Sequence, residues 1–260
     1  MRNKNGYSFS RVPIAVVALL LLLVSGCAST PTQDNADPLE PMNRVFYDFN
    51  DALDKYFFKP VAEVYVDYTP QPVRTSVTNF FENLSYLNVI LNDLLQGKFR
   101  QGVDDTARLF VNSTIGLGGF FDPATSAGLV RHNEDLGQTF GRWGLAEGAY
   151  LVLPLRGPDS VRDVGNIGTS SLLSPFFYLA TAITLPLGTI SLINTRANLL
   201  EATEIRDEAA LDPYVFTREA YRQRREYEIY DGDTPEEQYD EFFEDDEFFE
   251  DDDLLEDDGS

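Results

Sequence analysis

Residues 164–195 form 32 consecutive positions without a charged side chain, and this stretch limits what the chain can fold into more than any other. Its most apolar part, residues 172–193, is long enough to cross a bilayer, which requires roughly twenty residues. Pro175, Pro186 and Gly188 interrupt it and favour two short arms over one spanning helix. We therefore expect a hairpin that enters one membrane leaflet, and a buried helical hairpin in a soluble core is the alternative. The side chains expected in the lipid are Phe176, Phe177, Ile183, Leu185 and Leu187.

A second apolar run lies at the N-terminus and ends at Cys27, the only cysteine of the chain. Basic residues precede about thirteen apolar positions, which is the layout of a secretory signal and is too short to span a bilayer. Val24, Ser25 and Gly26 before the cysteine resemble a bacterial lipobox, in which the thiol is acylated and the chain is cut before the cysteine. We expect residues 1–26 to be the signal peptide. An ordinary signal with a chance cysteine is the alternative.

Acylation of Cys27 would tie the mature chain to a membrane face, since each buried CH2 contributes about 0.8 kcal/mol. Residues 27–36 are small and polar, and they fit a flexible lipidated tether. Ala28 follows the cysteine, whereas an aspartate there resembles the signal that retains lipoproteins on the inner membrane. The sequence therefore favours the periplasmic face of the outer membrane of a Gram-negative cell.

The acidic charge of the chain is concentrated at its C-terminus. Residues 231–260 carry 17 of the 43 acidic side chains and no basic ones, so this tail repels itself and is expected to be disordered. Three apolar doublets within it could dock on a basic partner, and a purely solubilising tail is the alternative. The remaining body is mildly acidic and lacks the basic footprint of nucleic-acid binding. A single cysteine also excludes a disulfide framework.

The body, residues 37–230, shows helical periodicity over most of its length. Apolar side chains recur at i, i+3, i+4 and i+7 over residues 41–57, which predicts an amphipathic helix. Prolines at 60, 70 and 72 should break the following region into short pieces, with Pro72 opening a new helix. Further apolar segments end at Gly97, a plausible C-terminal cap, and a third helix is expected over residues 103–115.

The middle of the chain has less regular patterning. Residues 116–133 are predicted to be a long loop, and they contain the only histidine, His132, which we expect in solvent and not at a metal. A short helix with four glycines in and after it follows, and glycine in a helix costs up to about 1 kcal/mol relative to alanine. Those glycines imply close packing, bending or a hinge. Residues 150–155 predict a short extended segment.

Near the end of the body, Asp212 and Pro213 have the pattern of a helix N-cap followed by proline at the first helical position. Clustered arginines on this last helix could bind anionic lipid head groups at roughly 1 kcal/mol each. Glutamates on the same helix could instead neutralise them. The arginines are Arg218, Arg222, Arg224 and Arg225, and the glutamates are Glu219, Glu226 and Glu228.

The sequence contains no nucleophile elbow, phosphate-binding glycine loop or zinc-protease motif, and its carboxylates show no spacing that singles out an acid and base pair. We therefore expect no enzyme and no cofactor. Apolar and amphipathic helices beside a lipid anchor suit lipid handling or scaffolding at a membrane.

A series of short motifs, in this order and spacing, resembles the VacJ/MlaA family of lipoproteins over about residues 37–230. The motifs are Asp37-Pro38-Leu39-Glu40 with Asn43-Arg44, Pro70-Gln71-Pro72-Val73-Arg74, Asn79-Phe80, Leu95-Gln96-Gly97, Gly116-Leu117-Gly118-Gly119-Phe120, Phe140-Gly141, Leu153-Pro154, Thr195-Arg196, and Asp212-Pro213-Tyr214 with Arg218-Glu219-Ala220-Tyr221.

This resemblance implies an all-α fold in which a ring of amphipathic helices lies in the inner leaflet of the outer membrane around a polar channel. It implies a lipoprotein of the Mla pathway that removes misplaced phospholipids from the outer leaflet, sits beside a trimeric porin, and passes lipid to a soluble periplasmic carrier protein. It also makes Gly141, Gly144 and Gly148 candidates for a flexible gate. A structural anchor that links the outer membrane to porin or periplasmic partners is the alternative, and a phospholipase is disfavoured by the missing nucleophile motif.

Overall fold

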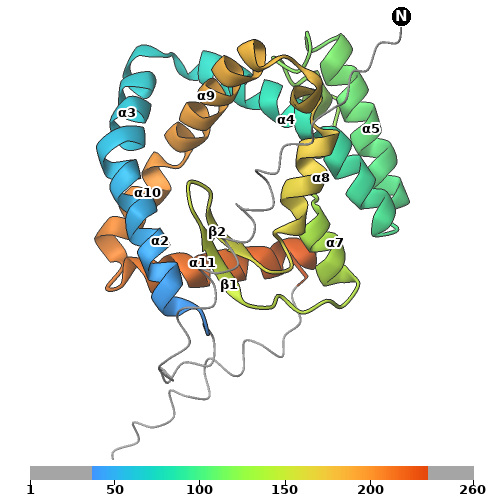
Figure 1. The fold of residues 1–260 in the computed structure, drawn as a ribbon. Coiled ribbons are helices and arrows are strands. Elements are labelled where there is room, and N and C mark those ends of the chain that lie inside the picture. The colour runs from blue at the N-terminus through green and yellow to red at the C-terminus, as the bar shows by residue number, and fades with distance from the viewer. Residues whose placement is uncertain (1–36, 234–260) are drawn as a thin grey trace, which may run out of the picture.

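The computed structural model describes residues 37–233, which form a helical domain (Figure 1). The expectations for Cys27, the tether and most of the acidic tail lie outside the described residues. The elements in chain order are α2 (Glu40–Leu53), the π-helical turn η1 (Asp54–Phe58), α3 (Lys59–Tyr68), α4 (Gln71–Leu95), α5 (Phe99–Thr114), α6 (Pro123–Ser126), α7 (Leu136–Arg142), β1 (Tyr150–Leu153), β2 (Gly157–Ser160), α8 (Gly165–Leu173), the 3-10 helix η2 (Pro175–Tyr178), α9 (Thr181–Asn198), α10 (Leu200–Ala209) and α11 (Pro213–Ile229).

The helices follow one another around a ring, and the β1–β2 hairpin points into its interior (Figure 1). α3 packs against α9, α9 packs against α4, and α4 contacts both α8 and α7. α11 contacts α7 and β2, while α2 contacts β1. α5 lies along α4 on the outside of the ring. The helix-rich fold expected from the sequence is confirmed.

The ring closes where the beginning of the domain meets its last helix. Asp37 accepts hydrogen bonds from Asn43 at 3.1 Å and from the hydroxyl of Tyr214, and all three residues are buried. Arg44 on α2 pairs with Asp212, the N-cap of α11, at 2.8 Å. The motif at residues 37–44 and the motif at residues 212–221 therefore meet in one polar contact, in which donors of one motif bind acceptors of the other.

The extended segment predicted over residues 150–155 forms strand β1, which pairs antiparallel with β2. Two asparagines of α2, Asn43 and Asn50, lie two helical turns apart and both reach β1. Each carboxamide donates to one carbonyl of this segment and accepts one of its amides, at distances of 2.8–3.0 Å. These side chains take the place of a neighbouring strand, so they fix the hairpin to the ring.

The predicted break at Pro60 is wrong, because α2 continues through η1 into α3 as far as Tyr68. The amide of Lys59 bonds to the carbonyl of Asp54, five residues back. This π-helical turn shifts the hydrogen-bond register immediately before Pro60, which lacks an amide proton and sits in the first turn of α3. Likewise, the two apolar segments before Gly97 form one continuous helix, α4, and Gly97 caps it with a positive φ of 78°.

Of the three predicted interruptions of the uncharged stretch, only Pro175 marks a bend, because it begins η2. The chain turns at η2, between α8 and α9, whereas α9 runs through Pro186 and Gly188 without a break. Proline near the start of a helix removes one backbone hydrogen bond, and the remaining three turns of α9 are long enough to tolerate that loss. Within residues 37–233, every helix is either too short or too polar to cross a bilayer.

Candidate functional site

The described residues bury polar side chains and expose apolar ones. Nineteen polar or charged residues of this part of the chain are buried, against nine hydrophobic ones. Large apolar side chains are exposed on most helices, including Tyr56 at 87%, Phe110 at 70% and Leu185 at 66%. Large exposed apolar patches are uncommon on water-soluble proteins and typically mark contact with lipid or a partner. The exterior of the ring is therefore suited to an apolar environment.

The side chains predicted to enter lipid differ in their exposure. Phe177, Ile183 and Leu185 are exposed, while Phe176 and Leu187 are half-buried. The ring of Phe176 lies 5.9 Å from that of Phe81 on α4. The structure therefore places three of the five side chains on the surface and uses Phe176 to hold η2 against α4.

Arg225 of α11 organises the polar interior between α7, α8 and α11. It bonds both carboxylate oxygens of Asp135 at 2.9 Å and one oxygen of Asp163 at 3.0 Å. Tyr221 and Arg162 also donate to Asp163, at 2.5 and 3.0 Å. Burial alone would raise the pKa of Asp163, but attraction to Arg225 and these hydrogen bonds outweigh it and lower the pKa to about 2.

Gly137 of α7 allows this arrangement. A Cβ atom at residue 137 would lie 2.2 Å from a carboxylate oxygen of Asp163 and 2.6 Å from a guanidinium nitrogen of Arg225. No side chain larger than hydrogen fits there without moving the ion pair. This glycine therefore serves close packing and not flexibility.

A second buried cluster joins α4, α5 and the loop before α7, and it has too few cations. Asp93 and Asp105 are fully buried, and each has one carboxylate oxygen without a hydrogen-bond partner. Burial, followed by the neighbouring carboxylates, raises the pKa of Asp93 to about 7, and burial raises that of Asp105 to about 6. Glu134 lies close by and accepts from Lys98 and Gln101, both at 2.8 Å. Two buried carboxylates this close repel each other when both are charged, so the folded state favours a proton on one of them.

His132 belongs to the same cluster, so the prediction that it is solvated is wrong. Its Nδ1 atom lies 3.0 Å from a carboxylate oxygen of Asp105, and its side chain is only 27% exposed. Nowhere in residues 37–233 do three histidine, cysteine or acidic side chains group in a way that could hold a metal ion. The loop before α7 therefore packs against α5 through this contact.

The arginines of α11 pair with acidic side chains, as in the second of the two alternatives, in which glutamates neutralise them. Arg224 pairs with Glu228 at 2.8 Å, Arg218 with Glu219 at 2.7 Å, and Arg222 lies 3.7 Å from Glu147. These partners belong to the protein itself. The sequence pattern had revealed the acidic neighbours on α11, but it could not reveal partners on other elements.

The three candidate gate glycines each have a local structural reason. Gly144 has a φ of 88° and ends α7 in a Schellman motif, in which the amide of Leu145 bonds to the carbonyl of Phe140 at 2.9 Å. Gly148 also has a positive φ, of 74°. A Cβ atom at Gly141 would lie 2.7 Å from the side chain of Ile229 on α11. Their role as a gate stays a prediction.

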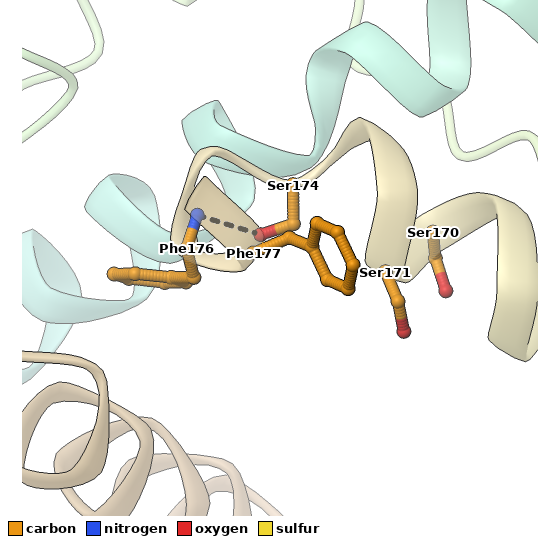
Figure 2. Close-up of a pocket in the computed structure, with 5 residues that line it drawn as sticks. All are labelled: Ser170, Ser171, Ser174, Phe176 and Phe177. Atoms are coloured by element: carbon orange, nitrogen blue, oxygen red, sulfur yellow. Dashed lines mark hydrogen bonds between the residues drawn. The ribbon is translucent and has the colours of Figure 1, made fainter. Parts of the chain in front are cut away.

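Two adjoining cavities lie where α8 and η2 meet α4 and α9. The first, of about 410 Å³, is lined by Ser170, Ser171, Ser174, Phe176 and Phe177, which Figure 2 shows along α8 and η2. The second, of about 380 Å³, shares Ser170, Ser174 and Phe176 with the first. Its complete lining is Phe81, Glu82, Leu84, Ser85, Asn88, Ser170, Leu173, Ser174, Phe176, Ser191 and Thr195. We call this second space the serine cavity.

The serine cavity combines hydroxyl groups with phenyl rings and was missed by the sequence analysis. A signal was present, because Ser170 and Ser174 on one side, and Ser191 and Thr195 on the other, are each four residues apart in an otherwise apolar stretch. Residues four apart share one face of a helix. These four hydroxyl-bearing residues therefore mark a polar wall within an otherwise apolar stretch.

Comparison with known proteins places this chain beside one family. The family described as MlaA lipoprotein matches residues 35–228. The chain is 36% identical over 223 residues to the intermembrane phospholipid transport system lipoprotein MlaA of Shigella flexneri, and equally to that of Escherichia coli K12. Each alignment covers 84% of this chain and 88% of the relative. The Haemophilus influenzae protein of the same description is 28% identical over 228 residues, which cover 84% of this chain and 91% of that one.

A solved structure gives the same result. It comes from work on the structural basis for maintenance of bacterial outer membrane lipid asymmetry, and it superposes with a TM-score of 0.67 at 34% sequence identity. The match covers 75% of this chain and all of the other. Sequence and fold therefore agree in one assignment.

Proposed function

The chain belongs to the MlaA lipoprotein family, and from this premise we propose that it removes misplaced phospholipids from the outer leaflet of the outer membrane and passes them to a soluble periplasmic carrier. Its relatives are described as lipoproteins of an intermembrane phospholipid transport system, and the solved structure concerns outer-membrane lipid asymmetry. The proposed outcome is the maintenance of that asymmetry.

The proposal rests on one observation: many polar side chains are buried, and many large apolar side chains are exposed. Moving one exposed phenylalanine or leucine out of water contributes roughly 1.5–3 kcal/mol, so the exterior of the ring favours lipid. An unpaired polar group costs several kcal/mol in hydrocarbon, and the ion pairs and hydrogen bonds of the interior avoid that cost. A lipid with a polar head can thus meet polar protein groups while its acyl chains stay in an apolar environment.

We propose the following arrangement around this body. Residues 1–26 are removed as a signal peptide, Cys27 is acylated, and residues 27–36 tether the helical domain, residues 37–230, to the periplasmic face of the outer membrane. The α8–η2–α9 hairpin enters the inner leaflet, a trimeric porin lies beside the ring, and the acidic tail, residues 231–260, reaches into the periplasm. Transport then follows the relative affinities of leaflet, protein and carrier, without covalent chemistry.

The test is to delete the gene and measure outer-leaflet phospholipid. Accumulation that is reversed by the wild-type gene, but not by Cys27→Ser, supports transport by an anchored protein. Unchanged phospholipid together with altered envelope mechanics would support the structural anchor instead. Phospholipid hydrolysis by the purified protein would contradict the proposal and indicate an enzyme.

A further inference from the structure

We infer that the serine cavity binds the glycerol–ester region of a diacyl lipid and not its head group. The inference rests on the proposed function and adds how the lipid is recognised. It predicts that lipids with different head groups bind this site equally.

The wall of the serine cavity has hydroxyl groups that can donate hydrogen bonds to a ligand. Ser174 Oγ accepts the amide of Phe176 at 3.3 Å, so its own proton points elsewhere. Ser191 and Thr195, by contrast, make no hydrogen bond through their hydroxyl groups to another of the described residues. These three hydroxyls are free to donate, and ester carbonyls are acceptors without charge. The wall therefore matches the chemistry of two acyl esters.

The lining of the serine cavity carries almost no charge. Glu82 is the one charged residue among the described side chains that line the cavity, and it already forms an ion pair with Arg131. Sites that select phosphate groups typically supply arginine forks or helix N-termini. Ser170 and Ser85 sit within helices and donate to their own backbone, at 2.6 and 3.0 Å. The lining therefore offers no cation that would hold a phosphate.

The size and the apolar lining of the serine cavity also fit part of a diacyl lipid. Ligand pockets typically measure roughly 300–1,000 Å³, and a cavity of about 380 Å³ is large enough for part of a diacyl lipid only. Phe81, Leu84 and Leu173 provide the apolar part of its lining. Phe176 and the exposed Phe177 line the adjoining cavity beside it. The acyl chains can follow these rings while the esters stay at the hydroxyls.

The experiment measures lipid binding to the purified full-length protein in neutral detergent by native mass spectrometry. The probes are phosphatidylethanolamine, phosphatidylglycerol, a diacylglycerol, and an ether-linked phosphatidylethanolamine that lacks the ester carbonyls. We expect the three ester lipids to bind within about threefold of one another and the ether lipid about tenfold more weakly, because one or two hydrogen bonds of roughly 1 kcal/mol each are lost. A tenfold preference between head groups, or equal binding of the ether lipid, would overturn the inference.

Two variants locate the site. Ser191→Leu fills the cavity, and the double variant Ser191→Ala with Thr195→Val removes two hydroxyls at nearly constant volume. Both should lower binding of ester lipids about tenfold, and the double variant should erase the difference between ester and ether lipids. The matched control is Thr189→Leu on the same helix, which is exposed and lines neither cavity. Binding by Ser191→Leu equal to that of the control would show that the site lies elsewhere.

The same variants separate this inference from the proposed function. If the gene deletion raises outer-leaflet phospholipid but Ser191→Leu complements it fully, transport stands and the serine cavity is not its lipid site. If the deletion leaves the outer leaflet unchanged, the proposed function fails whatever the cavity binds in detergent.

Discussion

Two buried carboxylate clusters of this protein have pKa values shifted in opposite directions, although they are buried to a similar degree. Asp163 lies against Arg225 and Arg162, and its pKa falls to about 2. Asp93 lies against Asp105, and burial raises its pKa to about 7. Burial opposes ionisation at both places. The comparison shows that the number of cations within reach, and not the depth of burial, decides which aspartate is charged.

The two clusters must therefore contribute to stability in opposite directions with pH. A carboxyl whose folded pKa is lowered stabilises the fold above its unfolded pKa of roughly 4, and this contribution is lost as the pH falls through about 2. A carboxyl whose folded pKa is raised has the reverse effect, because the folded state holds its proton more tightly. Its stabilisation is present below roughly pH 4 and is lost as the pH rises to about 7.

The largest effect is expected from breaking the first cluster. Arg225→Met leaves Asp135 and Asp163 buried without their main cation. The free energy of unfolding should therefore fall by roughly 3–5 kcal/mol. The measurement is urea unfolding in detergent at pH 7, followed by the fluorescence of Trp143, the only tryptophan of the chain.

Arg224→Met is the matched control, because Arg224 is 70% exposed and pairs only on the surface of α11. Its loss should cost less than about 1 kcal/mol. Equal effects of the two substitutions would mean that the Asp135–Arg225–Asp163 contacts do not hold the ring together.

A smaller and opposite effect is expected from the second cluster. Asp93→Asn cannot ionise, so it removes the penalty of charging residue 93 in this buried site. The variant should match the wild type near pH 4 and become more stable by roughly 2–4 kcal/mol at pH 8. Unfolding measured at several pH values gives this difference directly. Asp48→Asn, at an exposed position of α2, should show no such trend.

The smallest effect sharpens the same comparison. Glu134→Gln removes a third carboxylate whose charge raises the pKa of both Asp93 and Asp105. The midpoint of the pH-dependent stability loss should therefore move to lower pH. An unchanged midpoint would show that burial and the Asp93–Asp105 contact account for the whole shift.

These clusters mark the limit of what the sequence could predict. Helical periodicity revealed the helices of the ring, because an amphipathic pattern is local. Pro60 and Pro186 gave wrong breaks, since a π-helical turn and a position near the start of α9 accommodate them. The pairing of Arg225 with Asp135 spans 90 residues of sequence, and no local pattern identifies such a partner.

The candidate site was predicted in part. Of the side chains predicted to enter lipid, Phe177, Ile183 and Leu185 are exposed, and their entry into a leaflet stays a prediction. The serine cavity could not be predicted because its two polar walls lie on different helices, and their approach depends on how η2 turns the chain. Even so, the spacing of four between the polar residues of each wall was visible in the sequence.

The most direct test of the central claim, that the apolar exterior lies in lipid, is fluorescence quenching by brominated phospholipids. With Trp143 replaced by phenylalanine, one new tryptophan is placed at Leu185 on the exterior and, separately, at Glu204 on the acidic face of α10. In reconstituted vesicles, the tryptophan at position 185 should be quenched several-fold more strongly than the one at position 204. Equal and weak quenching at both positions would contradict the account, because the exterior would then face water.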